Sequence, residues 1–563
     1  MALRRGSDTL SVMPTVSAQI ALALAEHVEH VFGVMGNGNA YLLDAFERLP
    51  GVTVTTVRHE AGAVVAADAF HRASGGLAVA TATYGAGFTN MLTPLAESVL
   101  GRVPMVVVVG DQPTVGPRPW DVDQVAIASA VGARTFTVGV DDSGLDDAAA
   151  VTCDAIEWAL TRRTPVVLAI PYDVAAREAG PSAARAITRP SSVIPQRAAV
   201  DELVELLASA RHPHLLGGRG AWLAGAGAAL GELADLVGAT TSTTALGRGL
   251  FPRGEFDLGV TGGFGAEQAM AVVGQADVAV VFGAALNQFT TRFGDLFDPE
   301  TVVVQVDVAE TPTNPRVNRF LRGDAALVAV AVAEGLRTRG IPSTGWRESL
   351  EIAPLRRYEP GTGVAPDGRL DPRSVAERIA ELLPDDRVVV TDGGHFLGWV
   401  NMFWPVSAPD RMMTIGTAYQ SIGLGFSSVA GAARAKPEST VVLATGDGGG
   451  LMALAELETA VRVAAGRGIA VVWNDAAYSA EVTLYGRAKG LSLEPMLIPE
   501  VDFAALGEAV GAEGVVVRAI ADLDRLATWS AEPAASRRFL VLDCRISGEI
   551  VAPYQQEIIR VNS

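Results

Sequence analysis

Three features of the sequence together predict an α/β protein with parallel sheets. Short runs of valine, isoleucine and leucine recur along the chain, and continuous runs of this kind are typical of strands buried on both faces. Longer segments with helical periodicity separate the runs, as in parallel sheets whose faces are covered by helices. Two stretches with the composition of linkers, 175–196 and 344–372, divide the chain. We therefore expect three doubly wound parallel-sheet domains of ordinary size, 12–180, 197–342 and 370–556.

The runs that predict strands occur in all three parts. They are 54–57, 103–109 and 165–170 in the first part, 278–282 and 302–306 in the second, and 388–390, 441–444, 469–473 and 539–542 in the third. A helical pattern over about 60–73 follows the first of them, and another over 451–465 follows 441–444. Several of these strands end in glycine-rich or polar segments, at the edge where parallel sheets bind ligands.

The composition excludes several classes of protein. The formal net charge is −19, and a field of that sign repels phosphate backbones, so we expect no nucleic-acid partner. The two cysteines, Cys153 and Cys544, form neither a disulfide framework nor a zinc motif, which fits a reducing interior. Residues 1–11 lack an apolar stretch of signal-peptide length, and no segment has the roughly 18 consecutive apolar residues of a membrane span. We expect a cytoplasmic protein.

The strongest local signal lies at the ends of two neighbouring strands. The strand 441–444 runs into Thr445-Gly446-Asp447-Gly448-Gly449-Gly450, and 469–473 runs into Asn474-Asp475-Ala476-Ala477-Tyr478. Both ends should lie on the carboxyl edge of one parallel sheet. Glycines there let backbone N–H groups approach a phosphate, and Asp447 offers a hard oxygen ligand for Mg²⁺. The competing interpretation is a tight glycine turn with a helix-capping aspartate.

This pair of turns resembles the metal motif of the thiamine diphosphate enzyme superfamily, which starts Gly-Asp-Gly and usually ends Asn-Asn somewhat under thirty residues later. Here Asn474 and Asp475 lie 27 and 28 residues after Asp447. The resemblance implies Asp447, Asp475 and the carbonyl of Ala477 as Mg²⁺ ligands, with aspartate in place of the usual asparagine. If the register shifts by one, Asn474 and Ala476 are the ligands instead. Cofactor contacts are implied for Gly446, Gly448, Gly449 and Tyr478.

A second motif lies in the first part of the chain. After the strand 54–57, Arg58-His59-Glu60 opens a helix of small residues. By itself Glu60 is a carboxylate that the helix dipole favours. The pattern resembles the surroundings of the family's cofactor-activating glutamate. That glutamate hydrogen-bonds a pyrimidine nitrogen of thiamine diphosphate and favours the imino tautomer, which then deprotonates the thiazolium carbon.

Further segments are similar to the acetolactate synthase and benzaldehyde lyase group of this family, and the similarity extends over nearly the whole chain. In the first part they are 32–39, 84–90 and 121–126. They imply Asn37 as a catalytic candidate and a substrate pocket lined by Gly36, Phe88, Trp120 and, from the third part, Ala480.

In the third part the similar segments are 391–395 and 421–426. The resemblance implies that Gly393, Gly394 and His395 contact the diphosphate and that the backbone of Gln420 contacts the pyrimidine amine. Ile422 is implied to be the apolar wedge that bends the cofactor, although by itself it would be an ordinary core residue.

Two further observations concern the type of reaction and the central domain. The paired histidines typical of pyruvate decarboxylases are absent near 110–113, whereas Glu481 matches a decarboxylase glutamate in its spacing from Asp475. Some relatives of the acetolactate synthase group bind FAD in the central domain without a redox role. The arginine that those relatives carry is absent from 284–288, and 217–220 is too loose for a dinucleotide motif. We expect no FAD and keep its binding as an alternative.

The resemblance implies a thiamine diphosphate- and Mg²⁺-dependent carboligase or lyase, that is, a transferase or lyase acting on a 2-oxo acid. The cofactor ylide adds to the acid, carbon dioxide leaves, and the enamine attacks a carbonyl acceptor. A simple 2-oxo acid decarboxylase is the second hypothesis, and a catalytically silent scaffold or regulatory homologue is the third. In the family the first and third domains meet across a subunit interface, which implies a homodimer or homotetramer with sites at that interface.

Overall fold

The computed structural model describes residues 14–562 except 142–143, 181 and 183–184. The chain divides into two compact units, which are described separately. The first contains residues up to 190 together with 415–437 and 453–463, and the second contains 191–414, 438–452 and the remainder from 464. The predicted domain start at residue 12 lies outside the described residues, and the other predicted domain boundaries stay predictions. Within the described residues, no helix is both long and apolar enough to cross a membrane.

The first unit contains a six-stranded sheet with the order β2-β1-β3-β4-β8-β5, in which every pairing is parallel. Its valine-rich inner strands β3, β4 and β8 are fully buried, as continuous apolar runs predict. The strands are β1 (Val28–Gly33), β2 (Thr53–Thr56), β3 (Leu77–Ala82), β4 (Met105–Asp111), β5 (Arg134–Thr137) and β8 (Pro165–Pro171), beside a small hairpin of β6 (Val140–Asp141) and β7 (Gly144–Leu145).

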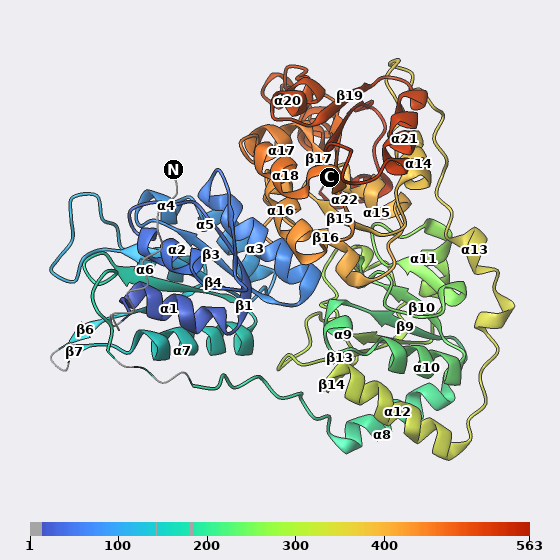
Figure 1. The fold of residues 1–563 in the computed structure, drawn as a ribbon. Coiled ribbons are helices and arrows are strands. Elements are labelled where there is room, and N and C mark those ends of the chain that lie inside the picture. Colours follow the sequence, from blue (N-terminus) through green and yellow to red (C-terminus); the bar gives the residue numbers. More distant parts are fainter. Residues whose placement is uncertain (1–13, 142–143, 181, 183–184, 563) are drawn as a thin grey trace. The chain divides into compact units, whose positions relative to one another are not determined.

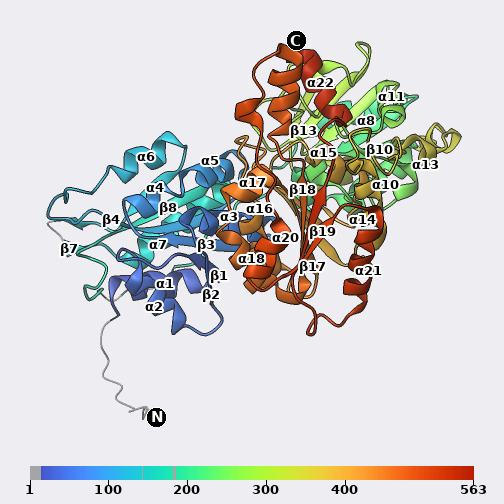
Figure 2. The same cartoon turned by 90° about the horizontal axis from the view of Figure 1, so that it is seen from above.

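The helices of this unit come from both ends of the chain. From the N-terminal part they are α1 (Val16–Ala25), α2 (Ala40–Glu47), α3 (Glu60–Ser74), α4 (Ala86–Thr89), α5 (Leu92–Leu100), α6 (Gln124–Ala130) and α7 (Ala148–Arg162). The later segments contribute α16 (Gly425–Ala435) and nearly all of α18 (Glu456–Ala464). Helices α3 and α16 lie side by side (Figures 1 and 2). They approach so closely that a Cβ on Gly431 would lie 1.9 Å from the carbonyl oxygen of Ala66.

The second unit contains two six-stranded sheets, both with parallel pairings. The central sheet has the order β11-β10-β9-β12-β13-β14, which is the order of dinucleotide-binding sheets. Its elements are α8 (Arg197–Ser209), β9 (Pro213–Gly217), α9 (Arg219–Leu223), α10 (Gly227–Val237), β10 (Thr240–Thr243), β11 (Asp257–Val260), α11 (Glu267–Gly274), β12 (Val278–Phe282), β13 (Val302–Asp307), β14 (Arg319–Arg322), α12 (Ala325–Arg339) and α13 (Ile352–Leu355).

The C-terminal sheet has the order β16-β15-β17-β18-β20-β19. Numbered from its own first strand, this order is the same as that of the first sheet. Its elements in the second unit are α14 (Pro372–Leu382), β15 (Arg387–Thr391), α15 (Leu397–Phe403), β16 (Met412–Thr414), β17 (Thr440–Gly446), α17 (Asp447–Met452), β18 (Gly468–Asn474), α19 (Ser479–Glu481), α20 (Phe503–Ala509), β19 (Glu513–Val517), α21 (Asp524–Ala531), β20 (Leu540–Arg545) and α22 (Pro553–Asn562).

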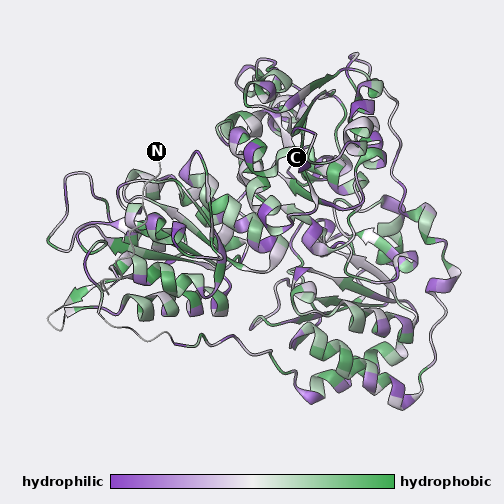
Figure 3. Cartoon of the chain, in the orientation of Figure 1, coloured by the Kyte–Doolittle hydropathy of each residue, from purple (hydrophilic) through white to green (hydrophobic). Residues whose placement is uncertain are grey.

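The predicted α/β class with three parallel sheets is confirmed, and the strands inferred from apolar runs are present with small changes at their ends. Most strands are coloured as hydrophobic in Figure 3. One helix prediction was wrong. The segment expected to become helical at 451 is helical from Asp447, and this helix, α17, ends at Met452 before α18 begins. The glycines after Asp447 adopt the right-handed helical backbone, and a carboxylate in the first turn favours that helix.

Candidate functional site

Three neighbouring strands of the C-terminal sheet end beside one another. In the sheet order β17 lies between β15 and β18, with Thr391 opposite Ala444 and Gly446 opposite Trp473. In the sheet order, β16 lies on the outer side of β15, and β18 lies on the opposite side of β17. The strand order therefore reverses between β15 and β17. Such a reversal is a topological switch point, where parallel sheets bind ligands at their carboxyl edge. The predicted residues 393–395, 446–449 and 474–478 lie at or just after the carboxyl ends of these three strands.

Asp447 is a buried carboxylate whose negative charge is poorly compensated. It is 3% exposed, and one oxygen accepts the backbone N–H of Gly448 at 2.9 Å. Its Oδ2 atom has no hydrogen-bond partner in the described part of the chain. Burial, followed by the negative charge of Asp475, raises the pKa of Asp447 to about 7. A divalent cation would satisfy both the open oxygen and the accumulated charge, so these residues fit Mg²⁺.

Asp475 lies beside Asp447 and pairs with a histidine from the neighbouring turn. Its Oδ2 atom is 3.0 Å from Nε2 of His395, and its side chain is fully buried. Burial acts to raise the pKa of Asp475, but the charge of His395 and the hydrogen bonds from His395, Ser479 and the Ala477 backbone together lower it. Burial conversely acts to lower the pKa of His395, and Asp475 raises it above its usual value. The extra charge that aspartate brings to this position therefore has a partner inside the protein.

The hydrogen bonds around 474–478 bear on the register of the candidate ligands. The side-chain amide of Asn474 donates to the Val501 carbonyl and to Asp543, which ties it into the sheet. The carbonyl of Ala476 accepts the N–H of Ile498 at 2.9 Å. The Oδ1 atom of Asn474, the atom that could ligate a metal, is buried and has no hydrogen-bond partner in the described residues, so the register of the candidate ligands stays a prediction. Among the described residues, no group of three or more His, Cys, Asp or Glu side chains is placed to hold a metal, so Mg²⁺ here would also need backbone and diphosphate oxygens.

The turns next to the carboxylates are shaped by close contacts with aromatic rings. A Cβ on Gly448 would lie 2.6 Å from Cε1 of Tyr478, and one on Gly394, which has a φ of 149°, would lie 2.5 Å from a ring carbon of Phe396. The hydroxyl of Tyr554 in α22 donates to the carbonyl of His395 at 2.9 Å. The segments predicted to bind phosphate, one of which is the first turn of α17, therefore pack closely against aromatic side chains, and Tyr554 makes a contact that the sequence did not reveal.

Ala480 and Glu481 follow in α19, and Glu481 is exposed. Its negative charge contributes, after that of Asp475, to the raised pKa of His395. A segment of π-helix, Val482–Arg487, continues from it, and such segments are frequent at functional sites. Glu481 therefore belongs to the same group of side chains as the two aspartates.

Glu60 is the first residue of α3 in the other unit. His59 is the N-cap of this helix, and its Nδ1 atom accepts the backbone N–H of Ala61 at 3.1 Å. The Nδ2 atom of Asn90 donates to Oε2 of Glu60 at 2.9 Å. The described residues donate no hydrogen bond to the second carboxylate oxygen of Glu60. Asn90 was not predicted as a site residue, because its relation to Glu60 depends on how β3 and β2 are placed in the sheet.

Asn37 also has a partner that the sequence did not reveal. Its side-chain amide donates to the hydroxyl of Tyr84 at 3.0 Å. The guanidinium of Arg118 lies 4.1 Å from the centroid of the same tyrosine ring and is ion-paired with Asp121 at 2.7 Å. Trp120 is 61% exposed beside this cluster. Of the other predicted pocket residues, Phe88 is fully buried in the unit, and Gly36 is close to Thr83.

Gln420 and Ile422 lie in a loop of the same unit as Glu60. Gln420 is exposed and adopts a φ of 60°, which is uncommon for a residue other than glycine. Its side chain donates to the carbonyl of Thr417 at 2.9 Å, and Ile422 is partly buried. The unusual backbone of Gln420 makes it a place where the local conformation is fixed by its surroundings. Since Asp447 belongs to the other unit, the meeting of Glu60 with the aspartates stays a prediction.

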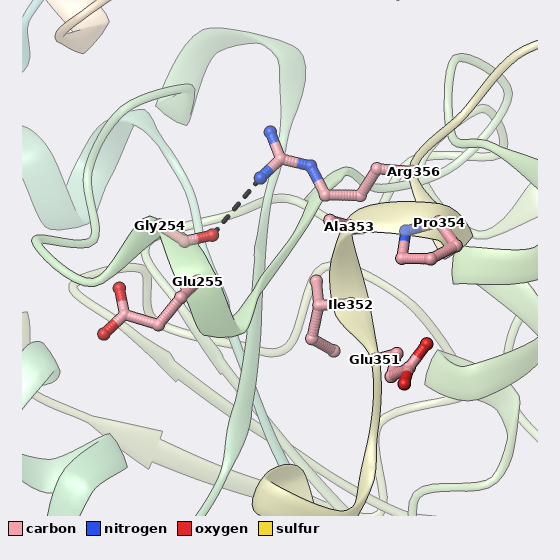
Figure 4. Close-up of a pocket in the computed structure, with 7 residues that line it drawn as sticks. All are labelled: Gly254, Glu255, Glu351, Ile352, Ala353, Pro354 and Arg356. Carbon is pink, nitrogen blue, oxygen red and sulfur yellow. Dashed lines mark hydrogen bonds between the residues drawn. The ribbon is translucent and has the colours of Figure 1, made fainter.

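Two glycines at the carboxyl edge of the central sheet are packed closely against Gly283. A Cβ on Gly218 would lie 2.4 Å from the carbonyl oxygen of Gly283, and one on Gly220 would lie 2.9 Å from Gly283 itself. The glycines at this edge therefore serve the close packing of two protein loops. A pocket of about 410 Å³ lies elsewhere in the unit, where Arg356 donates to the Gly254 carbonyl (Figure 4). None of the predicted site residues lines it.

Comparison with known protein families gives three matches, in the order of the three sheets. The thiamine pyrophosphate enzyme N-terminal TPP-binding domain matches residues 14–127, the central domain matches 200–332, and the C-terminal TPP-binding domain matches 392–544. Together these ranges cover most of the chain.

The chain belongs to the thiamine pyrophosphate enzyme family.

Several relatives from bacteria and archaea resemble this family member over most of their length. An acetolactate synthase from Mycobacterium avium is 27% identical, with 87% of this chain and 80% of the relative covered. Acetolactate synthase isozyme 3 large subunit from Escherichia coli is 26% identical over 94% of each chain. A probable acetolactate synthase large subunit from Methanococcus aeolicus is 27% identical over 79% of this chain and 78% of its own. The prediction of a thiamine diphosphate-dependent enzyme of the acetolactate synthase-like group, acting on carbon–carbon bonds, is confirmed.

Proposed function

We propose that this thiamine pyrophosphate enzyme is a Mg²⁺-dependent carboligase or lyase that takes a 2-oxo acid as donor and a second carbonyl compound as acceptor. The observation that carries the proposal is the pair of buried aspartates, Asp447 and Asp475, at the switch point of the third sheet. It is supported by the similarity to acetolactate synthases over most of the chain. Thiamine diphosphate, when bound, supplies a carbanion-like nucleophile and an acceptor for the electrons released by decarboxylation.

The residues of the chain have separate tasks in this proposal. Asp447, Asp475 and the Ala477 carbonyl would hold Mg²⁺, while His395 and the first turn of α17 would face the diphosphate. On the first unit, Glu60 presents a carboxyl group to a pyrimidine nitrogen, and Asn90 fixes its orientation. Asn37 and Trp120 lie at the same edge of the first sheet and contact the substrate. Because the tasks are divided between residues of the two units, we propose a homodimer or homotetramer in which each site combines both.

A simple 2-oxo acid decarboxylase is the second candidate function. It is favoured by Glu481, which is exposed and whose charge acts on His395, and a carboxyl group so placed is a candidate proton donor. A carboligase must keep protons away from the reacting carbon, whereas a decarboxylase must deliver one. The two functions therefore differ in what is released, not in how the cofactor is held.

The test is a product screen. The purified protein with thiamine diphosphate and Mg²⁺ is offered several 2-oxo acids, singly and together with aldehydes, and products are identified by mass spectrometry. A ligated product supports the carboligase, and carbon dioxide with a free aldehyde supports the decarboxylase. A catalytically silent homologue would release neither. Glu60→Gln should abolish most of the turnover, and the absorption spectrum of the purified protein should show no flavin.

A further inference from the structure

Two buried glutamates of the first unit each accept hydrogen bonds from a backbone segment that is distant in the sequence. Glu456 begins α18 and is 2% exposed. Its Oε1 atom accepts the backbone N–H groups of Arg58 and His59, at 2.9 and 2.7 Å. These two residues come directly before Glu60. A carboxylate from the C-terminal third thus anchors the backbone that presents the candidate activating glutamate of the N-terminal third.

Glu97 makes the reciprocal contact. It lies in α5 of the N-terminal third and is 1% exposed. One of its oxygens accepts the N–H of Tyr419 at 2.6 Å, and the other accepts the N–H of Ala418 at 3.2 Å. These residues come directly before Gln420, the residue with positive φ whose backbone is the candidate contact for the pyrimidine amine. The N-terminal and C-terminal thirds therefore each supply a buried carboxylate that binds the backbone next to a candidate cofactor contact in the other.

The surroundings show that both carboxylates are fixed in place. A Cβ on Gly62, in the first turns of α3, would lie 2.6 Å from Oε1 of Glu456, so the helix presses directly on the carboxylate. The side chain of Arg58 is ion-paired with Glu458 at 2.7 Å, but both side chains are partly exposed and the backbone N–H groups of 58 and 59 are held by Glu456 alone among the described residues. Near Glu97, the Nη2 atom of Arg72 lies 4.0 Å from Oε1. Hydrogen bonds from backbone N–H groups to a buried ionised carboxylate are among the stronger hydrogen bonds in proteins.

We propose that Glu97 and Glu456 are positioning residues for catalysis, which set the backbone of Gln420 and the start of α3 so that both contact the pyrimidine ring of the cofactor correctly. The proposal rests on the proposed function, because it takes Glu60 and Gln420 as the pyrimidine contacts. Neither glutamate touches the cofactor. Their contribution is the orientation of groups that do, and a misplacement of about 1 Å in such groups can cost on the order of 100-fold in rate.

The test uses the full-length protein with Glu97→Gln, Glu456→Gln, Glu60→Gln and the matched control Glu458→Gln. In Glu97→Gln one of the two N–H groups would face an amide NH₂, which cannot accept it. In Glu456→Gln the oxygen that accepts both N–H groups loses its negative charge, so both hydrogen bonds are weakened. The first readout needs no cofactor. Amide hydrogen exchange of the apoprotein should rise at 58–59 in Glu456→Gln and at 418–419 in Glu97→Gln, and at neither site in Glu458→Gln.

The second readout is deuterium exchange at the thiazolium carbon of bound thiamine diphosphate, at saturating cofactor and Mg²⁺, with the near-ultraviolet circular dichroism of the bound pyrimidine. Glu97→Gln and Glu456→Gln should slow the exchange on the order of 10- to 100-fold and change the dichroism. Glu458→Gln should match the wild type. Should a glutamine variant fail to fold, the aspartate variants, which keep the charge but are shorter by one methylene group, provide the same comparison.

The outcomes separate the two proposals. Normal thiazolium exchange in both Glu97→Gln and Glu456→Gln, with exchange lost in Glu60→Gln, would overturn the positioning role and leave the proposed function standing. Normal exchange in Glu60→Gln would overturn the proposed role of Glu60 and the positioning role with it.

Discussion

The first and third sheets have the same strand order, but the loops at their carboxyl edges have different chemistry. In the third sheet this edge gathers two buried aspartates and a histidine, with glycines packed against aromatic rings. In the first sheet it carries Glu60 with Asn90, and a cluster in which Asn37 and Trp120 are exposed and Tyr84 is partly buried. The shared topology brings the loops to equivalent places in each sheet, and the side chains give the two edges different chemistry. The proposed function therefore assigns the metal and phosphate to one edge and the organic ring and substrate to the other.

The largest effect is expected at the third sheet. Asp447→Asn removes a charged oxygen ligand, and we expect the affinity for thiamine diphosphate in the presence of Mg²⁺ to fall at least about 100-fold, beyond the 10- to 100-fold typical for residues that only support a ligand. Isothermal titration calorimetry measures it, with exposed Asp385→Asn as control. Affinity that survives in Asp447→Asn would show that the metal is held elsewhere.

A matched pair of glycine substitutions compares the two edges directly. In Gly448→Ala the new Cβ would meet the ring of Tyr478 at 2.6 Å, and in Gly36→Ala it would meet Cβ of Thr83 at 2.8 Å. Overpacking of this kind typically costs about 1–3 kcal/mol. We expect Gly448→Ala to weaken cofactor binding about tenfold and Gly36→Ala to raise the substrate KM with cofactor affinity kept. The reverse pattern would exchange the roles assigned to the two edges.

A smaller effect is expected at Asn90. Asn90→Ala removes the donor to Glu60, and one hydrogen bond to a charged group contributes roughly 1.5–3 kcal/mol. Because Glu60 is half-buried, solvent should replace part of this, and we expect kcat to fall about threefold to tenfold at unchanged cofactor affinity. A change in cofactor affinity alone would argue against an orienting role for Asn90.

The smallest effect on function is expected for Asp475→Asn, which introduces the residue usual in the family. The carboxylate of Asp475 raises the pKa of His395 against the opposing effect of burial, so the substitution should lower that pKa. Histidine chemical shifts followed by NMR over a pH series of the apoprotein measure it. An unchanged titration of His395 would mean that the contact at 3.0 Å is not an ion pair in solution.

Much of the fold was predictable, because inner strands of parallel sheets are continuous apolar runs. Edge strands such as β5 and β14 were harder, since they are partly exposed and interrupt apolar residues with arginine and threonine. The motif residues were predictable only because they resemble a family with known spacing. Asn90, Glu97 and Glu456 were not, because their functional partners lie up to 398 residues away in the sequence and only the folded chain brings them together.

The close packing of α3 against α16 has a consequence for the design of truncated forms of this protein. The compact unit that contains the first sheet includes α16 and nearly all of α18, which come from beyond residue 414. At Gly431, α16 lies so close to the main chain of α3 that a methyl group would not fit. Truncation after residue 190 would strip that cover from a helix whose residues from Gly62 to Ala73 are all buried. A fragment that contains only residues up to 190 would therefore expose the buried face of α3, and such a face promotes aggregation. A fragment of this unit should include α16.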